Sequence, residues 1–241
     1  MTEFIPQAIN IRGAIGDSEI LADALCKDLK PGTLLDIGCG EGFIAIDIAK
    51  RRPDINILGI DVDTVKCAAA QINIENAKIT DRVQIMCADV FKTHLPISDA
   101  ICCNPPLLPA EQGFFTDEGI SQNLFWKILV EKIHTEEVSP LIYLHLFDFH
   151  GINHRTGKLP SLEEVASTTG FSMAILYRGI RQIGENSRVR YNLPELADYF
   201  PEGSVIVDDS EVLMYTLSNI YINTVANLSI HQSIIRLSRS Q

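Results

Sequence analysis

The stretch TLLDIGCGEG, residues 33–42, constrains the fold of this chain more than any other part of the sequence. A run of leucine and β-branched residues ends in Asp36, glycines follow at Gly38, Gly40 and Gly42, and the helical pattern FIAIDIAKRR comes next. A strand that turns at once into a helix needs residues that tolerate unusual φ and ψ angles, and glycine tolerates them. Such a turn leaves backbone N–H groups and a bare surface for a ligand at the helix N-terminus. A tight connection without a ligand is the alternative.

Three more predicted strands follow, and each ends in polar residues. INILGI leads to Asp61, about 20 residues beyond the glycines, where nucleotide-binding α/β units place an acidic group on ribose hydroxyls. RVQIMCADV ends at Asp89, and DAICCNPPL contains Asn104. The carboxyl ends of parallel strands lie along one edge of an open sheet. We therefore expect Asp36, the glycines, Asp61, Asp89 and Asn104 to converge on one crevice.

The pairing of DIGCGEG with NPP at this separation resembles the class I S-adenosylmethionine-dependent methyltransferases, in the branch with an N-P-P-aromatic motif. The resemblance covers residues 34–146. Protein-glutamine N5-methyltransferases and N6-adenine or N2-guanine RNA methyltransferases are the most similar members. The resemblance implies an α/β fold with a Rossmann-like, seven-stranded, mostly parallel sheet, an antiparallel last strand and helices on both faces.

The resemblance also implies where S-adenosylmethionine binds. Asp36 and the glycine turn would surround its methionine part, Asp61 would accept from its ribose hydroxyls, and Asp89 with neighbouring backbone would hold its adenine. No metal is required. The cofactor-binding candidates are Asp36, Gly38, Cys39, Gly40, Gly42, Asp61, Val62, Asp89 and Val90.

The catalytic candidates are Asn104, Pro105, Pro106 and Leu107. By resemblance, the Asn104 side chain and the Pro105 carbonyl would hold the acceptor nitrogen. A planar amide or aromatic amine nitrogen is a poor nucleophile, and two acceptors for its N–H groups would orient it and stabilise the positive charge that grows on it. Leu107 departs from the family pattern, because leucine offers a weaker platform for a nucleobase than an aromatic ring.

The methyl acceptor stays open between two classes. The net charge of −11 and the pI near 4.9 favour a protein glutamine-type amide or a small molecule over nucleic acid. An RNA or DNA base is the alternative, which the arginine-containing region from Arg178 to Arg190 would serve if it forms a basic patch. Two alternatives belong to other functional classes: an NAD(P)-binding Rossmann oxidoreductase, and a non-catalytic module that binds the cofactor.

The 241 residues, 46% of them hydrophobic, suit one α/β domain with additions. We expect an N-terminal arm and helix in residues 1–32, with Asp17 or Ser18 as helix cap, and a methyltransferase domain in 33–218. No apolar run reaches the roughly 20 residues of a membrane span, and no signal peptide is evident, so a cytoplasmic location is predicted. Six cysteines without C-x-x-C pairing predict free thiols.

The second half of the chain is less constrained. PLIYLHLFDF predicts a fifth strand, and the nearby His145, Asp148, His150 and His154 are not expected to bind metal, because His145 and Asp148 fall on opposite faces. FSMAILYRGI predicts the sixth strand. EVLMYTLSN, residues 211–219, is predicted as its antiparallel partner, with an insertion at 181–209. The tail, residues 219–241, shows no clean period and receives no assignment.

Overall fold

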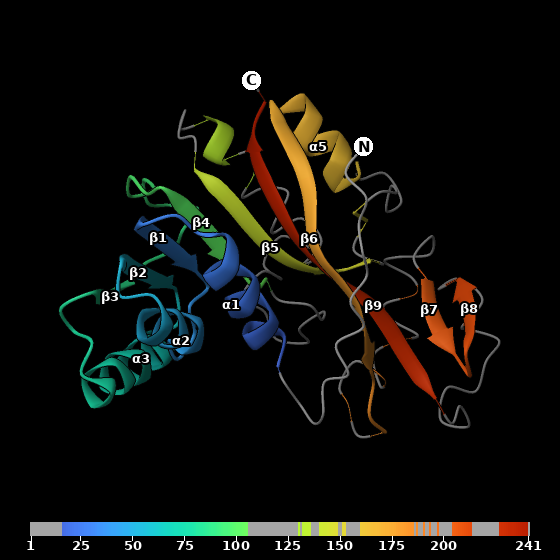
Figure 1. The fold of residues 1–241 in the computed structure, drawn as a ribbon, viewed down its shortest axis with the longest axis horizontal. Helices are drawn as coiled ribbons and strands as arrows, with labels where there is room; N and C mark the ends of the chain where they lie inside the picture. Colours follow the sequence, from blue (N-terminus) through green and yellow to red (C-terminus); the bar gives the residue numbers. More distant parts are fainter. Residues whose placement is uncertain are drawn as a thin grey trace.

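The computed structural model describes residues 16–105, 130, 132–135, 140–148, 151–152, 160–185, 187, 190, 193, 197, 204–213 and 227–240. These residues form one nine-stranded sheet with helices on its faces (Figure 1). Two members of the predicted N-P-P-L motif, Pro106 and Leu107, lie outside them, as do His150 and His154. No helix in the described ranges is both long and apolar enough to cross a membrane.

The first half of the sheet is parallel and runs in the order β3-β2-β1-β4-β5. Helices connect its first strands, as parallel pairing requires of crossovers. The predicted α/β fold with a large, mostly parallel sheet is confirmed. The strands are β1 (Gly32–Ile37), β2 (Ile55–Asp61), β3 (Val83–Cys87), β4 (Ala100–Cys103) and β5 (Leu141–Phe147).

The second half of the sheet is antiparallel. The long strand β9 (Leu228–Arg239) lies between β5 and β6 (Phe171–Gln182) and pairs with both. The prediction that residues 211–219 form the partner of β6 is wrong for residues 211–213, which lie in a strand paired with β7, whereas residues 214–219 lie outside the described part of the chain. The stretch that received no assignment contains β9, which does pair with β6. Ile230, Ile234, Ile235 and Leu237 are fully buried. Residues 232–235, in the middle of β9, are all buried, which interrupts the polar and apolar alternation that marks a half-exposed strand.

A hairpin of β7 (Ser204–Val207) and β8 (Ser210–Leu213) extends the sheet beyond the seven predicted strands. Asp208 and Asp209 form its two-residue turn with φ angles of 46° and 66°. Both central residues of a type I′ hairpin turn need positive φ, and aspartate tolerates this better than most residues. β7 pairs with the start of β9, so the hairpin lies at the far end of the sheet from β3 (Figure 1).

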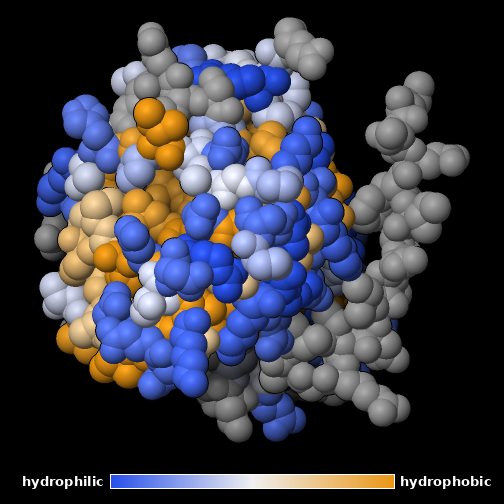
Figure 2. Space-filling view, turned by 60° about the vertical axis from the view of Figure 1, so that its left-hand side comes forward, coloured by the Kyte–Doolittle hydropathy of each residue, from blue (hydrophilic) through white to orange (hydrophobic). Residues whose placement is uncertain are grey.

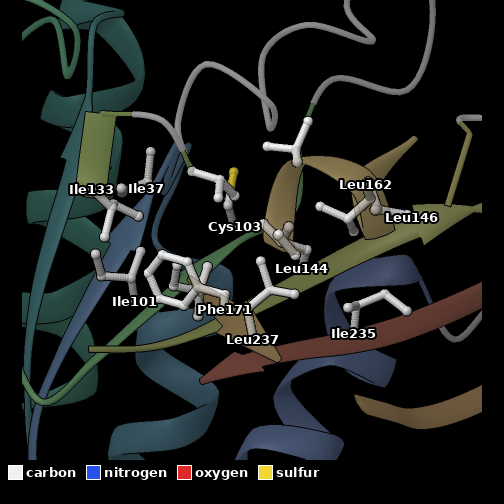
Figure 3. Packing of buried hydrophobic residues seen from close by; sticks show 14 of the residues in the cluster. Ile37, Ile101, Cys103, Ile133, Leu144, Leu146, Leu162, Phe171, Ile235 and Leu237 are labelled. Carbon is white, nitrogen blue, oxygen red and sulfur yellow. The ribbon is translucent and has the colours of Figure 1, made fainter. Parts of the chain in front are cut away.

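Buried side chains alternate along the central strands and build a core on each face of the sheet. Leu34, Cys102 and Tyr143 pack with the helices α1, α2 and α3. Their neighbours, among them Leu35 and Cys103, pack on the other face with α5 and the helical residues 132–135, and Figure 3 shows this core. The helices are α1 (Asp17–Asp28), α2 (Phe43–Arg51), α3 (Thr64–Ala77) and α5 (Leu162–Thr168).

The surface on the side of β1 to β3 is mixed. Figure 2 shows polar side chains interspersed with apolar ones over this side of the molecule. Scattered apolar residues are normal on a folded domain and need no partner to explain them. The features that point to a ligand lie instead at the carboxyl ends of the parallel strands.

Candidate active site

The strand registers bring the predicted residues to one edge of the sheet. Ile37, the last residue of β1, lies beside Ile60 of β2 and Cys103 of β4. One position further on, the glycine turn therefore lies between Asp61 on one side and Asn104 on the other. This is the convergence that the sequence predicts for an open parallel sheet.

The glycine turn has the backbone conformation that only glycine adopts readily. Gly38, Gly40 and Gly42 have φ angles of 72°, 55° and 83°. The N–H groups of Gly38 and Cys39 donate to the carbonyl of Ile60 at 2.8 and 3.1 Å, which ties the turn to β2. The helix α2 then begins directly after Gly42.

The glycines of the turn have different surroundings. A Cβ at Gly38 or Gly40 would have no described atom within 4 Å, so this side of the turn is open. A Cβ at Gly42 would lie 3.4 Å from the Cβ of Ala70, where α2 packs on α3. An open backbone surface at a helix N-terminus is what close approach of a cofactor requires.

Two hydrogen bonds to backbone N–H groups fix the side chain of Asp61 beside the glycine turn. Its Oδ2 accepts from the Gly40 N–H at 2.8 Å, and its Oδ1 accepts from the Asp63 N–H at 2.9 Å. Asp63 in turn caps α3 by accepting from the N–H groups of Val65 and Lys66. Because each carboxylate oxygen has a further lone pair, Asp61 can also accept from hydroxyl groups of a ligand.

Asp36 is a fully buried carboxyl group that is only half satisfied. Its Oδ1 accepts from the Cys102 thiol at 3.4 Å, while its Oδ2 has no hydrogen-bond partner among the described residues. Burial raises the pKa of Asp36 to about 7, and the nearby charge of Asp61 adds to this. Burial also raises the pKa of Cys102, so its thiol keeps the proton that it donates. When ionised, Asp36 places a negative charge behind the open glycine turn, and this charge favours a cationic group such as the ammonium or sulfonium of S-adenosylmethionine.

The residues after β3 lie at the same edge. The Ala88 N–H donates to the carbonyl of Asp61, and Asp89 accepts from the Phe91 N–H at 2.9 Å and from the Lys92 ammonium at 3.1 Å. Val90 is buried in the core, whereas Val62 is 45% exposed beside the turn.

Asn104 lies directly after β4, and both ends of its side-chain amide have partners. Its Nδ2 donates to the Ser18 hydroxyl at 3.1 Å, and its Oδ1 lies 3.1 Å from Nδ1 of His145. Pro105 follows as a buried residue. The motif thus contacts α1 and β5 as well as the turn, and the structure describes it as far as Pro105.

Sequence reasoning missed three residues around Asn104. The sequence predicts Asp17 or Ser18 as the helix cap. This prediction is wrong, because the N-cap of α1 is Gly16, which makes no side-chain hydrogen bond. The sequence singles out His145 only as a possible metal ligand. His145 lies two residues after the buried Tyr143, so both side chains lie on the face of β5 that α1 covers, and this spacing is a signal that could have found it. Gln232 lies in the stretch without an assignment. Within the described ranges, no three His, Cys, Asp or Glu side chains are grouped to hold a metal ion.

Comparison with known proteins agrees with this geometry. The family model of the methyltransferase small domain matches residues 15–127. The release factor glutamine methyltransferase of Rhodopirellula baltica is 40% identical over 84 residues, which cover 34% of this chain and 28% of that protein. The tRNA1(Val) (adenine(37)-N6)-methyltransferase of Vibrio cholerae is 33% identical over 95 residues, which cover 38% of this chain and 39% of that protein. The chain therefore aligns with less than half the length of these relatives.

Solved structures extend the likeness in fold to most of the chain. The YcgJ protein from Bacillus subtilis superposes with a TM-score of 0.60 at 11% identity and covers 92% of this chain and 99% of that one. Precorrin-6y C5,15-methyltransferase from Geobacter metallireducens has a TM-score of 0.51 at 11% identity, and the match covers 92% of this chain and 87% of that one. At such identities the likeness concerns the fold alone. The segment that matches the methyltransferase small domain model, residues 15–127, holds both the glycine turn and Asn104, and in this segment the chain is similar to that family.

Proposed function

We propose that this chain transfers a methyl group from S-adenosylmethionine to a planar nitrogen, with a protein glutamine-type amide as the favoured acceptor. The observation that carries the proposal is the pairing, at one sheet edge, of the open glycine turn with an Asn104 amide held between Ser18 and His145. The methyltransferase model that matches residues 15–127 supports this proposal over the oxidoreductase interpretation. A cytoplasmic location is part of the proposal, and fractionation of cells that express the chain tests it.

On the cofactor side, Asp36 and Asp61 have separate tasks. Asp36, which is fully buried, favours a positive charge beside the turn through its own negative charge, and Asp61 offers remaining lone pairs to ribose hydroxyls. When bound, S-adenosylmethionine supplies a methyl group already activated by a sulfonium. The protein therefore has mainly to position the nucleophile, which is catalysis by proximity and orientation.

On the acceptor side, Asn104 and Pro105 offer two oxygens to one nitrogen. The second lone pair of Asn104 Oδ1 and the Pro105 carbonyl would each accept from an N–H of the acceptor, which fixes the direction of its lone pair. Such acceptors also stabilise the positive charge that develops on nitrogen during transfer. Asn104 and Pro105 are thus the proposed catalytic residues, with Pro106 and Leu107 next to them in the sequence.

The surroundings of two arginines favour a protein acceptor over nucleic acid. Arg178 forms an ion pair with Asp148, and Arg181 forms one with Asp17. Paired guanidinium groups attract phosphates less than free ones do, and the whole chain carries a net charge of −11. The relatives act, by their names, on glutamine of a release factor and on adenine of a tRNA. An RNA base is therefore the second candidate.

The test is the transfer of label from methyl-tritiated S-adenosylmethionine into cell extract that is then divided into protein, nucleic-acid and small-molecule fractions. We expect label in the protein fraction with the wild-type chain and none with Asn104→Ala. Asn56→Ala is the matched control, because Asn56 is exposed on β2 away from this edge. Label in the nucleic-acid fraction would select the base alternative. Equal transfer by Asn104→Ala would refute the assignment of the acceptor site.

A further inference from the structure

His145 is a buried polar residue that connects Asn104 to the strand on the opposite side of β5. It is completely buried in the middle of the sheet, and its Nδ1 and Nε2 lie 3.1 Å from Asn104 Oδ1 and from Gln232 Oε1. Gln232, on β9, is 2% exposed. A polar group buried this deeply costs free energy unless it is hydrogen-bonded, and here both ring nitrogens have partners.

The backbone around His145 is rigid. β5 pairs with β4 as far as Leu144 and with β9 through His145, which lies opposite Ile234. Its ring meets that of Phe147 edge-on, with centroids 5.5 Å apart, and the Arg181 guanidinium lies over the Phe147 ring. A side chain on a central strand with packed neighbours can fix the position of a residue on the adjacent loop.

Each ring nitrogen of His145 faces a side-chain oxygen, so a neutral ring can donate to only one of the two. Because Asn104 donates through Nδ2 to Ser18, its Oδ1 faces the ring, and only a protonated Nδ1 can donate to that oxygen. Burial lowers the pKa of His145, although Asp17 and Gln232 oppose this. Asp17 lies 4.0 Å from Nε2 but is already paired with Arg181. In the Nδ1–H form the ring donates to Asn104 Oδ1, and the Gln232 amide has to turn so that its NH₂ instead of its Oε1 faces Nε2.

We propose that His145, in the Nδ1–H form and braced by Gln232, is a positioning residue that holds the Asn104 amide in one orientation. In that orientation one lone pair of Oδ1 is used by His145 and the other is directed to the acceptor nitrogen. This inference rests on the proposed function for its consequence in transfer. The hydrogen bonds themselves can be measured without any methyl acceptor.

The first experiment is nuclear magnetic resonance on the full chain without cofactor. In protein labelled with ¹⁵N-histidine, the signals absent from His145→Asn identify the ring of His145. We expect the Nδ1–H form between pH 6 and about 8, a change of these signals in Gln232→Met, and no change in His231→Leu. His231 precedes Gln232 on β9, and its side chain points to the other face of the strand.

The second measurement follows the Asn104 side-chain NH₂ signals, identified by their loss in Asn104→Asp. We expect them to move in His145→Leu and to return toward the wild-type position in His145→Asn. The side-chain nitrogen of asparagine occupies the place of Nδ1 of histidine and can donate in the same direction. If His145→Leu fails to fold, Gln232→Met and His145→Asn still test the contact.

The third measurement is methyl transfer at saturating S-adenosylmethionine. Misplacement of a positioned group by about 1 Å can lower the rate on the order of 100-fold. We expect a loss of kcat of this order in His145→Leu with the Kd for S-adenosylhomocysteine unchanged, partial recovery in His145→Asn, and wild-type kcat in His231→Leu. A purely structural role of His145 would instead lower the amount of folded protein and leave kcat per folded molecule unchanged.

The results separate failure of this inference from failure of the proposed function. Absence of methyl transfer by the wild-type chain would refute the function, while the ring form and the Asn104 signals would still decide whether the contact exists. An Nε2–H ring, or Asn104 signals that do not respond to His145→Leu, would overturn the inference. The inference would also be overturned if the Asn104 signals moved in His145→Leu while kcat stayed at the wild-type value.

Discussion

Replacement of Asp36 by asparagine is expected to stabilise the chain without cofactor at neutral pH. Asp36 is completely buried, its Oδ2 has no partner in the described part of the chain, and its pKa is raised to about 7 from the 3.8 of an exposed aspartate. Between pH 3.8 and about 7, Asp36 therefore holds a proton in the folded state that it has released in the unfolded state. Asparagine imitates the protonated form at every pH.

The sign and size of the effect follow from the bound protons. Where the folded state binds more protons than the unfolded state, the free energy of unfolding falls as pH rises. Each pH unit contributes about 1.4 kcal/mol, so the wild type should lose about 4 kcal/mol relative to Asp36→Asn between pH 4 and about 7. Above that range the difference should stay constant, because Asp36 is then ionised in both states.

Urea unfolding at half-unit steps from pH 4 to about 8.5 measures this difference. The comparison of Asp36→Asn with wild type at each pH cancels the titration of all other groups whose surroundings are unchanged. Asp81→Asn is the control, because its side chain is 72% exposed. A difference between wild type and Asp36→Asn that does not vary with pH would refute the reasoning. A difference that grows as pH falls would refute its sign.

Three further results are expected. Asp61→Ala should raise the Kd for S-adenosylhomocysteine by about 10- to 100-fold in calorimetry, the size of hydrogen bonds to a charged group, whereas Asp63→Ala should mainly cost about 1 kcal/mol of stability through the lost cap of α3. Gly59→Ala should destabilise by about 1–3 kcal/mol in urea, because its Cβ would lie 2.8 Å from Ile85 and 2.9 Å from the Cys39 sulfur, while Gly184→Ala, with no described atom within 4 Å of its Cβ, should not. Tyr143→Phe should cost about 1.5 kcal/mol, since the phenol donates to Asp28 at 2.8 Å; a melting temperature equal to wild type would contradict this.

The sequence predicts the parallel half of this fold because its signals are local. Each strand is a short apolar run, and each is followed by a turn or helix with recognisable chemistry, such as the glycines after Asp36 and the Asp63 cap of α3. The positions of Asp61 and Asn104 beside the glycine turn follow from these runs together with the rule on strand ends. Their roles in binding and transfer stay predictions until tested.

In the antiparallel half, the sequence predicts the strand β6 but not the strand that pairs with it. The middle of β9 is buried on both faces, and β9 pairs with strands far from it in sequence, so neither its period nor its neighbours in the sequence reveal it. The partners of Asn104 were missed for the same reason, because Ser18 and His145 are separated from it by 86 and 41 residues. Contacts over such separations depend on the register of whole strands, which a single sequence does not display.

The central place of β9 bears on the order in which the protein becomes functional during synthesis. Of the described elements, β9 leaves the ribosome last, yet β5 and β6 both pair with it. Domains form from the N-terminus onward as they emerge, and pairing between distant segments is slow. The nascent chain can therefore assemble the glycine turn with Asp36 and Asp61 before Gln232 exists to brace His145. On the proposed assignment, the segment with the cofactor-binding candidates is therefore synthesised well before the residue that braces His145.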